Sequence, residues 1–449
     1  MRRLLLLPAL SWAMLTCAGQ NQVNLVIVDP GHFHAALLQK DMYPPMSPRV
    51  AVYSPLTPEL VDYLNRISQF NRRAQSPTHW ELEVHTGGDS FERMLGDHAG
   101  NVVMFTGRNR GKIDRILRSL EAGYHVFADK PWIISSADLP KLARALDLAA
   151  EKNLAAYDIM TERYEITSLL QKELVATPEV FGTLVAGTAA EPGIRAKSIH
   201  HIMKNVAGVP ILRPAWFFDI REYGEALADV GTHVVDLVQW TAFGARQTDY
   251  RSDIAMLEAR HWPTRVSPQQ FKQVTGEGAF PAELAPWVKD GQFEFIANNS
   301  VHYTVGGVHV ALDILWNWEA PGDSGDVYEA SFRGTKARVE IRQSKAQNYR
   351  PELYVVPASA APEVFDRLRR RLRALQAKWP GLDIAIEGQE ARLVIPDQFR
   401  VGHEAHFAQV SNAFFSYFQN PRSLPAWEKS NMLAKYFITT KGVELANRN

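Results

Sequence analysis

The chain has 449 residues, of which 46% are apolar, and its 49 lysines and arginines balance its 49 aspartates and glutamates. This composition excludes a disordered chain, and the lack of a basic stripe argues against binding to nucleic acid. The only cysteine, Cys17, lies near the N-terminus. The rest of the chain therefore forms no intrachain disulfide and no thiolate metal site.

The first 18 residues have the pattern of an export signal. Arg2 and Arg3 precede an apolar run from Leu4 to Leu15, which is too short for a membrane span. We expect residues 1–18 to be a signal peptide, or a lipoprotein signal with Cys17 as the acylated residue. A buried first helix is the alternative, although no amphipathic period breaks the run. The protein is thus expected to be exported, periplasmic or lipid-anchored, with no other contact to a membrane.

Residues 23–160 alternate short apolar runs with amphipathic stretches. Such alternation predicts a doubly wound parallel sheet, a Rossmann domain, whose ligand lies at the carboxyl ends of the strands. The expected strands are residues 23–29, 50–54, 80–86, 101–107, 124–130 and 154–160, and the expected helices are 34–40, 58–67, 90–96, 112–123 and 138–152.

Residues 161–449 are expected to form a second, substrate-binding α/β domain, a mostly antiparallel sheet covered by helices. Residues 250–300 and 357–400 match no family pattern, and the basic stretch from Arg367 to Lys378 is interpreted as a solvated helix face. The expected strands are residues 183–186, 302–318, 327–332, 337–341 and 353–356, and the expected helices are 166–175, 406–418 and 427–445.

The turn after the first expected strand reads Asp29-Pro30-Gly31-His32-Phe33-His34. In a dinucleotide-binding fold this turn presents N–H groups to a pyrophosphate, which makes Gly31, His32 and Phe33 candidate cofactor ligands. Only Gly31 matches the G-x-G-x-x-G fingerprint, because Asp29 and His34 occupy the first and third glycine positions. Asp29 close to a pyrophosphate is unfavourable unless it is paired. A strand-to-helix turn without a nucleotide is the alternative.

The second and fifth expected strands also end in candidate residues. The second strand ends at Ser54 rather than at an acidic residue, which leaves NAD versus NADP open. The fifth strand is followed by Asp129-Lys130-Pro131. There the ammonium of Lys130 can polarise a substrate oxygen or hold a ribose hydroxyl, although a surface lysine before a turn is the commoner case.

A third motif is Asp229-x-Gly231-x-His233-x-x-Asp236. In a helix, positions 229, 233 and 236 share one face. A histidine held by Asp229 or Asp236 can serve as a general base. The alternative is a helix cap next to a core histidine.

Together these motifs resemble the Gfo/Idh/MocA family of glucose-fructose oxidoreductase and inositol dehydrogenase. The family combines a Rossmann domain with a Glu/Asp-Lys-Pro motif and a D-x-G-x-H-x-x-D motif in an α/β second domain. The resemblance implies NAD or NADP and a small carbohydrate or polyol ligand. A homo-oligomer is a further possibility that the sequence leaves open. It implies Lys130, Asp229 and His233 as catalytic residues, Asp129, Lys130 and Pro131 at the cofactor, and Arg163, Tyr164, Trp216 and Asp236 near the substrate.

Two further groups of histidines are candidates. His200 and His201 precede Trp216 and are expected to line a sugar pocket, with polar loop residues as the default. The stretch from His403 to His406 resembles a zinc motif, but its histidines are three rather than four residues apart. We interpret it as a helix surface and expect no metal.

Three functions fit these residues. The leading hypothesis is an NAD(P)-dependent oxidoreductase that acts on a sugar, polyol or glycoside by hydride transfer. An alternative is an NAD-dependent glycoside hydrolase, which oxidises the sugar transiently, eliminates its substituent and recovers the hydride on a tightly bound cofactor; export favours tight binding, because free NAD is scarce outside the cytosol. A second alternative is a sugar-binding protein without catalysis, suggested by the missing glycines.

Overall fold

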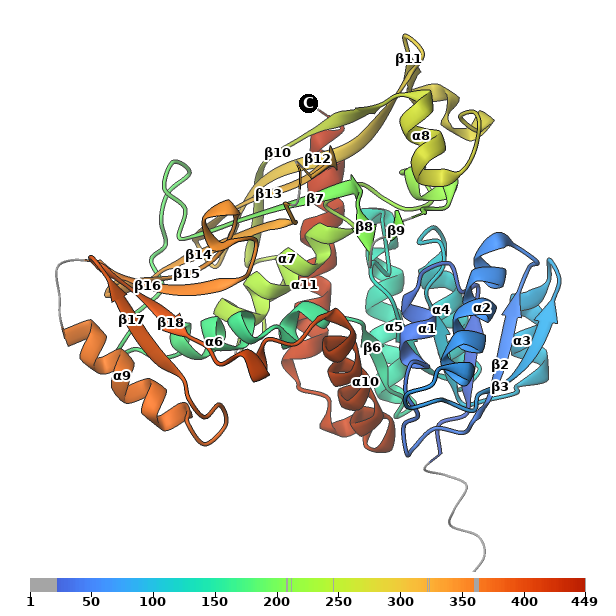
Figure 1. The fold of residues 1–449 in the computed structure, drawn as a ribbon, viewed down its shortest axis with the longest axis horizontal. Helices are drawn as coiled ribbons and strands as arrows, with labels where there is room; N and C mark the ends of the chain where they lie inside the picture. Colours follow the sequence, from blue (N-terminus) through green and yellow to red (C-terminus); the bar gives the residue numbers. More distant parts are fainter. Residues whose placement is uncertain are drawn as a thin grey trace, which may run out of the picture.

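The chain folds around two β-sheets that lie next to each other (Figure 1). The computed structural model describes residues 22–206, 209–210, 212–244, 246–320, 322, 324–358 and 363–448. The expected signal, residues 1–18, lies outside the described part. None of the described helices combines the length and the apolar character that a membrane span requires.

The N-terminal sheet has six strands in the order β3-β2-β1-β4-β5-β6, and every neighbouring pair is parallel. The order reverses between β1 and β4, which places a crevice at the carboxyl ends of these two strands. The predicted Rossmann sheet is therefore confirmed. The strands are β1 (Leu25–Val28), β2 (Arg49–Ser54), β3 (Glu81–Thr86), β4 (Val102–Phe105), β5 (His125–Ala128) and β6 (Ala156–Asp158).

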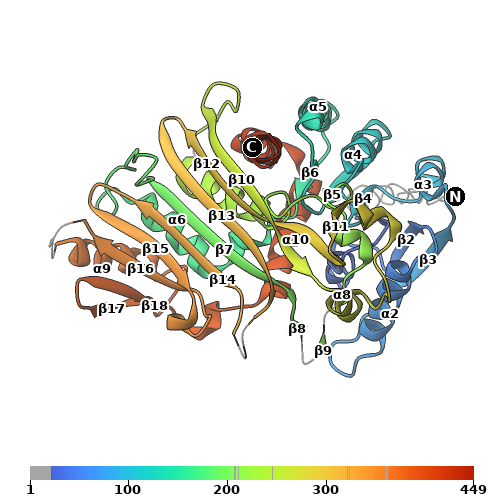
Figure 2. The same cartoon turned by 90° about the horizontal axis from the view of Figure 1, so that it is seen from above.

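The second sheet has ten strands, and its main path is β10-β12-β13-β7-β14-β15-β16-β18-β17 (Figure 2). Only β7 and β13 pair in parallel, so the prediction of a mostly antiparallel sheet is confirmed. The strands are β7 (Ile194–Met203), β10 (Ile254–Val266), β11 (Val288–Lys289), β12 (Gln292–Val305), β13 (Val308–Glu319), β14 (Val327–Arg333), β15 (Ala337–Gln343), β16 (Glu352–Pro357), β17 (Asp383–Glu387) and β18 (Glu390–Val394); β8 (Asn205–Val206) and β9 (Val209–Pro210) form a separate ribbon.

Two of the expected strands are wrong. Residues 302–318 are not one strand, because Gly306 and Gly307, with φ of 55° and 82°, form a turn between β12 and β13. Residues 183–186 make only an isolated bridge, from Leu184 to Gly334. Strands β7, β10, β17 and β18 were not expected from the sequence.

Helices cover both faces of the parallel sheet. On one face lie α3 (Ser90–Asp97), α4 (Lys112–Glu121) and α5 (Leu139–Glu151). The other face is covered by α1 (His34–Leu38), α2 (Pro58–Arg72) and, unexpectedly, α10 (His403–Gln419) from the far end of the chain. Helix α10 buries a stripe of phenylalanines on this face, and the ring of Phe414 stacks on Phe127 of β5 at 4.6 Å. The C-terminal segment thereby locks the two sheets together.

Another set of helices packs on the second sheet. Helix α6 (Ile166–Val175) contacts β15 and β16, α7 (Val230–Val238) contacts β7 and β13, and α11 (Trp427–Ala446) contacts β10, α7 and α5. Figure 1 shows α11 running between the two sheets. Helix α7, which carries the third sequence motif, is therefore held between the second sheet and the Rossmann domain. The remaining helices are α8 (Pro268–Thr275) and α9 (Glu363–Leu375).

We expect the unfolding free energy to fall as the pH drops from about 6.5 to about 4, and His125 to contribute to this fall. Burial lowers the pKa of His125 from 6.5 to about 4, and its Nδ1 accepts a hydrogen bond from the N–H of Ala155 at 2.9 Å. In this pH range the unfolded chain binds a proton at position 125 and the native chain does not, so acid favours unfolding. Denaturant unfolding across this range measures the effect.

The matched comparison is H125Q against H79Q, because His79 is exposed. The slope of unfolding free energy against pH should become shallower in H125Q and remain unchanged in H79Q. Equal slopes in H125Q and the wild type would contradict the assignment.

Candidate active site

An ion pair between Lys130 and Asp229 joins the two sheets at the centre of the molecule. Lys130 follows β5, and Asp229 directly precedes α7. The two side chains are only 10% and 6% exposed. Burial alone would raise the pKa of Asp229, but the ammonium of Lys130 and a hydrogen bond from Tyr223 hold it below its ordinary value. Burial would likewise lower the pKa of Lys130, yet Asp229 and Asp129 raise it. Both groups are thus charged at neutral pH.

His233 lies one helical turn beyond Asp229 on α7. Within the described residues, its buried Nδ1 has no hydrogen-bond partner. Burial, followed by the positive charge of Lys130, lowers the pKa of His233 well below its ordinary value. The charge of Asp129 acts on His233 in the opposite direction, so all three groups border one region. His233 is therefore a neutral imidazole beside a charged lysine, able to accept a proton.

Asp236, at the other end of the motif, belongs to a buried network. The guanidinium of Arg163 donates to both carboxylate oxygens of Asp236, at 2.6 and 2.7 Å, and to Glu428 at 2.9 Å. Lys435 bridges Asp236 and Asp158, at 3.0 Å from each. Within the described residues, all three nitrogens of the Arg163 guanidinium and both carboxylate oxygens of Asp236 are engaged in hydrogen bonds. We therefore expect them to hold α7 against α11 instead of contacting a substrate.

In the turn after β1, Asp29 stands at the position of the first glycine of the fingerprint and adopts a backbone conformation that glycine favours. Asp29 has φ of 46°, a left-handed conformation that aspartate tolerates better than most residues. Its carboxylate pairs with Arg115 of α4. This pair supplies the partner that an acidic residue needs beside a pyrophosphate, so the unfavourable charge noted in the sequence is balanced.

Gly31 lies where the backbone of the same turn approaches its neighbours closely. A Cβ at Gly31 would lie 3.1 Å from the Cα of Gly107 and 3.1 Å from the indole of Trp216. In the described part of the chain, the backbone N–H groups of His32, Phe33 and His34 have no partner. The turn thus presents three free donors at the carboxyl end of β1, as an anionic group requires.

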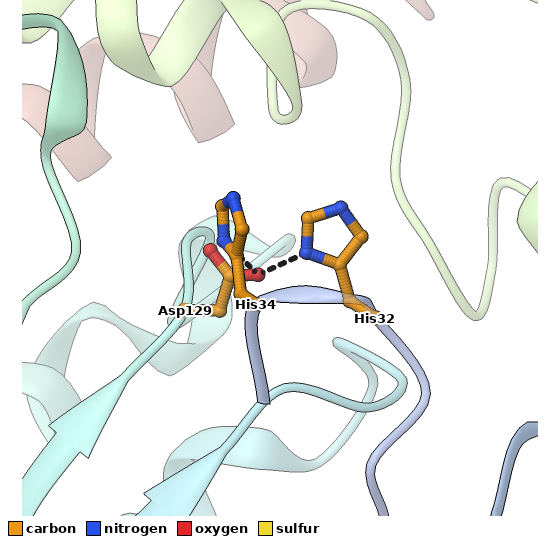
Figure 3. A group of neighbouring side chains, drawn as sticks. All are labelled: His32, His34 and Asp129. Atoms are coloured by element: carbon orange, nitrogen blue, oxygen red, sulfur yellow. Dashed lines mark hydrogen bonds and ion pairs between the residues drawn. The ribbon is translucent and has the colours of Figure 1, made fainter. Parts of the chain in front are cut away.

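Two histidines of the turn converge on the aspartate of the Asp-Lys-Pro motif (Figure 3). Oδ2 of Asp129 lies 2.8 Å from Nδ1 of His32 and 3.0 Å from Nδ1 of His34. Its other oxygen accepts the N–H of Lys130 at 2.9 Å. Burial lowers the pKa of His34 to about 4, and the nearby histidines hold the pKa of Asp129 well below its ordinary value against the effect of burial.

Trp216 connects the second domain to the turn. Its indole N–H donates to Glu59 of α2 at 2.7 Å, and the guanidinium of Arg108 lies 5.2 Å from the ring. Since the indole also lies against Gly31, Trp216 covers the turn directly. Of the other expected cofactor residues, Ser54 is buried at the end of β2, where its hydroxyl donates to the carbonyl of Pro55 at 3.0 Å.

The remaining expected substrate residues lie at different places. His200 and His201 each lie 3.2 Å from the carboxylate of Asp326. His200 also adds to the low pKa of Asp229, after Lys130 and Tyr223. His200 therefore lies near enough to the Lys130–Asp229 pair for its charge to act on Asp229. Tyr164 packs against the core of the N-terminal domain.

The sequence did not single out three residues at this site. The buried ammonium of Lys112 donates to the carbonyls of Asp129 and Pro131, at 3.0 and 3.2 Å, and burial lowers its pKa to about 8. Burial raises the pKa of Glu162 to about 7, with Lys130 opposing the shift. Tyr223 hydrogen-bonds Asp229. Of these three residues, only Glu162 could have been suspected from the sequence, because it directly precedes Arg163, a residue that the family resemblance places near the substrate.

The His403–His406 stretch begins α10 and is not simply a helix surface, as we expected. His406 is only 5% exposed, and the ring of His403 stacks on His34 at 5.1 Å. The burial follows from the packing of α10 on the parallel sheet, which the local pattern does not reveal.

A family model described as "Putative oxidoreductase C terminal domain" matches residues 170–447. The chain belongs to this family. A crystal structure of a "putative oxidoreductase" from Parabacteroides merdae is 41% identical, with a TM-score of 0.93, and the match covers 96% of this chain and 98% of that one. No curated protein matches the chain.

More distant structures share the fold of this oxidoreductase family. KijD10, a 3-ketoreductase from Actinomadura kijaniata in complex with TDP-benzene and NADP, is 14% identical with a TM-score of 0.55, and the match covers 93% of this chain and 96% of that one. Levoglucosan dehydrogenase, in complex with NADH and L-sorbose, is 13% identical with a TM-score of 0.58, and the match covers 95% and 97% of the two chains. The predicted membership among Gfo/Idh/MocA-type oxidoreductases is confirmed.

Proposed function

We propose that the protein is an NAD(P)-dependent oxidoreductase that transfers a hydride between its cofactor and a carbon of a sugar, polyol or glycoside. The observation that carries this proposal is the pairing of Lys130 with Asp229 beside a neutral His233. The nicotinamide cofactors and sugar-like ligands named for KijD10 and levoglucosan dehydrogenase support the proposal.

The turn after β1 and the Asp-Lys-Pro motif fit a dinucleotide. The free N–H groups of His32 and Phe33 suit a pyrophosphate. The close approach of Gly107 and Trp216 leaves no room for a side chain at Gly31 in this turn. A cavity of about 330 Å³ lies beside Arg115, the partner of Asp29, and is lined by Phe91 and Arg118. The guanidiniums of Arg115 and Arg118 lie 5.7 and 5.2 Å from the ring of Phe91. An aromatic ring with nearby guanidiniums suits the adenosine end of the cofactor.

Two residues of the chain, His233 and Lys130, then have different roles at the substrate oxygen. When it is bound, a nicotinamide ring supplies the hydride acceptor or donor. Oxidation of an alcohol also removes the hydroxyl proton, which the neutral imidazole of His233 can accept. Lys130, charged through its contact with Asp229, donates a hydrogen bond to the oxygen as negative charge develops there. In the reverse direction, protonated His233 returns the proton to the oxygen.

The first test is the cofactor content of the purified protein. We expect denaturation to release nicotinamide dinucleotide in about equal amount to the protein, because an exported enzyme must retain its cofactor. Incubation with a panel of sugars and glycosides should then give a keto-sugar with reduced cofactor, or the reverse reaction. Release of an aglycone with no net change in cofactor absorbance would contradict net oxidoreduction.

We further propose that the chain is exported with the cofactor already bound. The N-terminal charge pattern and apolar run support export. The mass of the mature protein from native cells tests this proposal. Loss of the first 16 residues together with lipid on Cys17, or cleavage after Ala18, is expected; an intact N-terminus in the cytosol contradicts it.

Substitution G31V should reduce dinucleotide binding at least about tenfold. The added side chain would enter a space where a single Cβ already meets Gly107 and Trp216 at 3.1 Å. We expect lower retained cofactor and weaker binding by fluorescence titration, with an unchanged far-ultraviolet circular dichroism spectrum. The control is G278V, because Gly278 has open space around its Cβ position. Equal cofactor affinity in G31V and the wild type would exclude the turn as the pyrophosphate site.

A further inference from the structure

His32, His34 and Asp129 form a cluster of polar side chains that cofactor binding alone does not explain. Oδ2 of Asp129 lies within hydrogen-bond distance of both Nδ1 atoms, and one ligand atom from each of the three residues lies within 4.8 Å of the others. Figure 3 shows both rings turned toward the same carboxylate. His34 stands where dinucleotide-binding turns have their third glycine, so an imidazole replaces open backbone next to the cofactor crevice.

We propose that His32, His34 and Asp129 bind one divalent transition-metal ion. Two imidazoles and one carboxylate suit zinc and iron(II), and three protein ligands leave positions open for water or a substrate oxygen. Tetrahedral coordination with metal–ligand distances of about 2.0–2.2 Å separates ligand atoms by about 3.3–3.6 Å. The distances of 2.8 and 3.0 Å between Asp129 and the two histidines need to lengthen only slightly.

Neighbouring groups fix the positions of Asp129 and His34, as they do for the ligands of metal sites. The N–H of Lys130 fixes the second oxygen of Asp129 at 2.9 Å. His34 is buried between the rings of His403 and Phe407, at 5.1 Å from each. Hydrogen bonds to a ligand carboxylate and packing around a ligand imidazole are the contacts that orient metal ligands.

One side of the site is open. The side chain of His32 is 35% exposed, whereas those of His34 and Asp129 are 3% and 5% exposed. A metal ion can therefore enter past His32, and Lys130 directly follows the proposed ligand Asp129 in the chain. Such an ion would bind the substrate oxygen or a water molecule beside it. The sequence alone gave no such expectation, because the histidines and the aspartate are 95 residues or more apart in the chain.

The test measures metal content rather than turnover. Wild-type protein is stripped with a chelator, incubated with Zn²⁺ or, without oxygen, with Fe²⁺, freed of loose metal and measured by elemental analysis. We expect about one ion per chain. The variants H34A and D129N should each retain less than about one-tenth of that amount.

The matched control is H302A. His302 and His309 also lie within 3.1 Å of each other, but among the described residues no carboxylate joins them in a metal-binding group. H302A should retain the full amount of metal. Since variants can fail to fold, calorimetric titration of stripped wild-type protein with Zn²⁺ gives a second measurement, in which one site with a micromolar or lower Kd is expected.

Two results would overturn the proposal: stripped wild-type protein that takes up neither ion, or a folded H32A/H34A variant that retains full metal. Because metal content is measured without turnover, its failure leaves the proposed hydride transfer standing. Conversely, absence of nicotinamide with one metal ion per chain would reject the proposed function and support the metal site.

Discussion

Substitution K130M is expected to lower kcat by about 10²–10⁴-fold. The ammonium is the charged donor that we propose for the substrate oxygen, and removing such a group has effects of this size. The substitution also leaves the carboxylate of Asp229, only 6% exposed, without its ion-pair partner. We therefore expect a loss of about 3–5 kcal/mol in unfolding free energy as well. Steady-state kinetics and denaturant unfolding measure the two effects.

A second substitution separates catalysis from stability. In K130M/D229N the buried site no longer holds an unpaired charge, so most of the lost unfolding free energy should return. The activity should not return, because the amide introduced at position 229 cannot replace the ammonium at the oxygen. If the double variant regained near-normal kcat, Lys130 would act only through the fold.

Substitution D236N should destabilise the protein by about 3–5 kcal/mol, the usual cost of breaking a buried ion pair. It removes the charge that Arg163 and Lys435 share, both of which are almost fully buried. Chemical denaturation should show a lower unfolding midpoint, and the KM of the residual folded enzyme should change little. Unchanged stability with a strongly raised KM would instead show that Asp236 binds substrate, as the sequence motif suggested.

The sequence predicted the Rossmann half well because its signals are local. Each buried strand of a parallel sheet reads as a short apolar run between amphipathic helices, and β1, β2, β4 and β5 follow this pattern. The edge strand β3 instead alternates polar and apolar residues. The resemblance implied Lys130 and Asp229 as residues of one catalytic site, but it did not predict their ion pair, which joins residues 99 positions apart in the chain.

Other features of the fold and of the site depend on contacts between distant parts of the chain, which local sequence patterns do not reveal. The amphipathic stripe of α10 predicts a buried face but not which sheet it covers, and the structure places Phe414 on the Rossmann sheet. The spacing of Asp229, His233 and Asp236 predicts a shared helix face. It does not predict that Lys435 and Arg163, which lie in distant segments of the chain, donate hydrogen bonds to the carboxylate of Asp236. The role of Asp29 was likewise hidden, because its left-handed backbone and its partner Arg115 appear only in three dimensions.

We propose that Lys130 and His233 act on one oxygen facing a nicotinamide ring. A crystal structure with dinucleotide and a sugar ligand tests this arrangement. We expect one sugar oxygen within about 2.7–3.2 Å of both Lys130 Nζ and a ring nitrogen of His233. The carbon bearing that oxygen should lie about 3–3.5 Å from the nicotinamide ring. A dinucleotide bound away from the β1 turn, or a sugar oxygen out of reach of both side chains, would contradict the account.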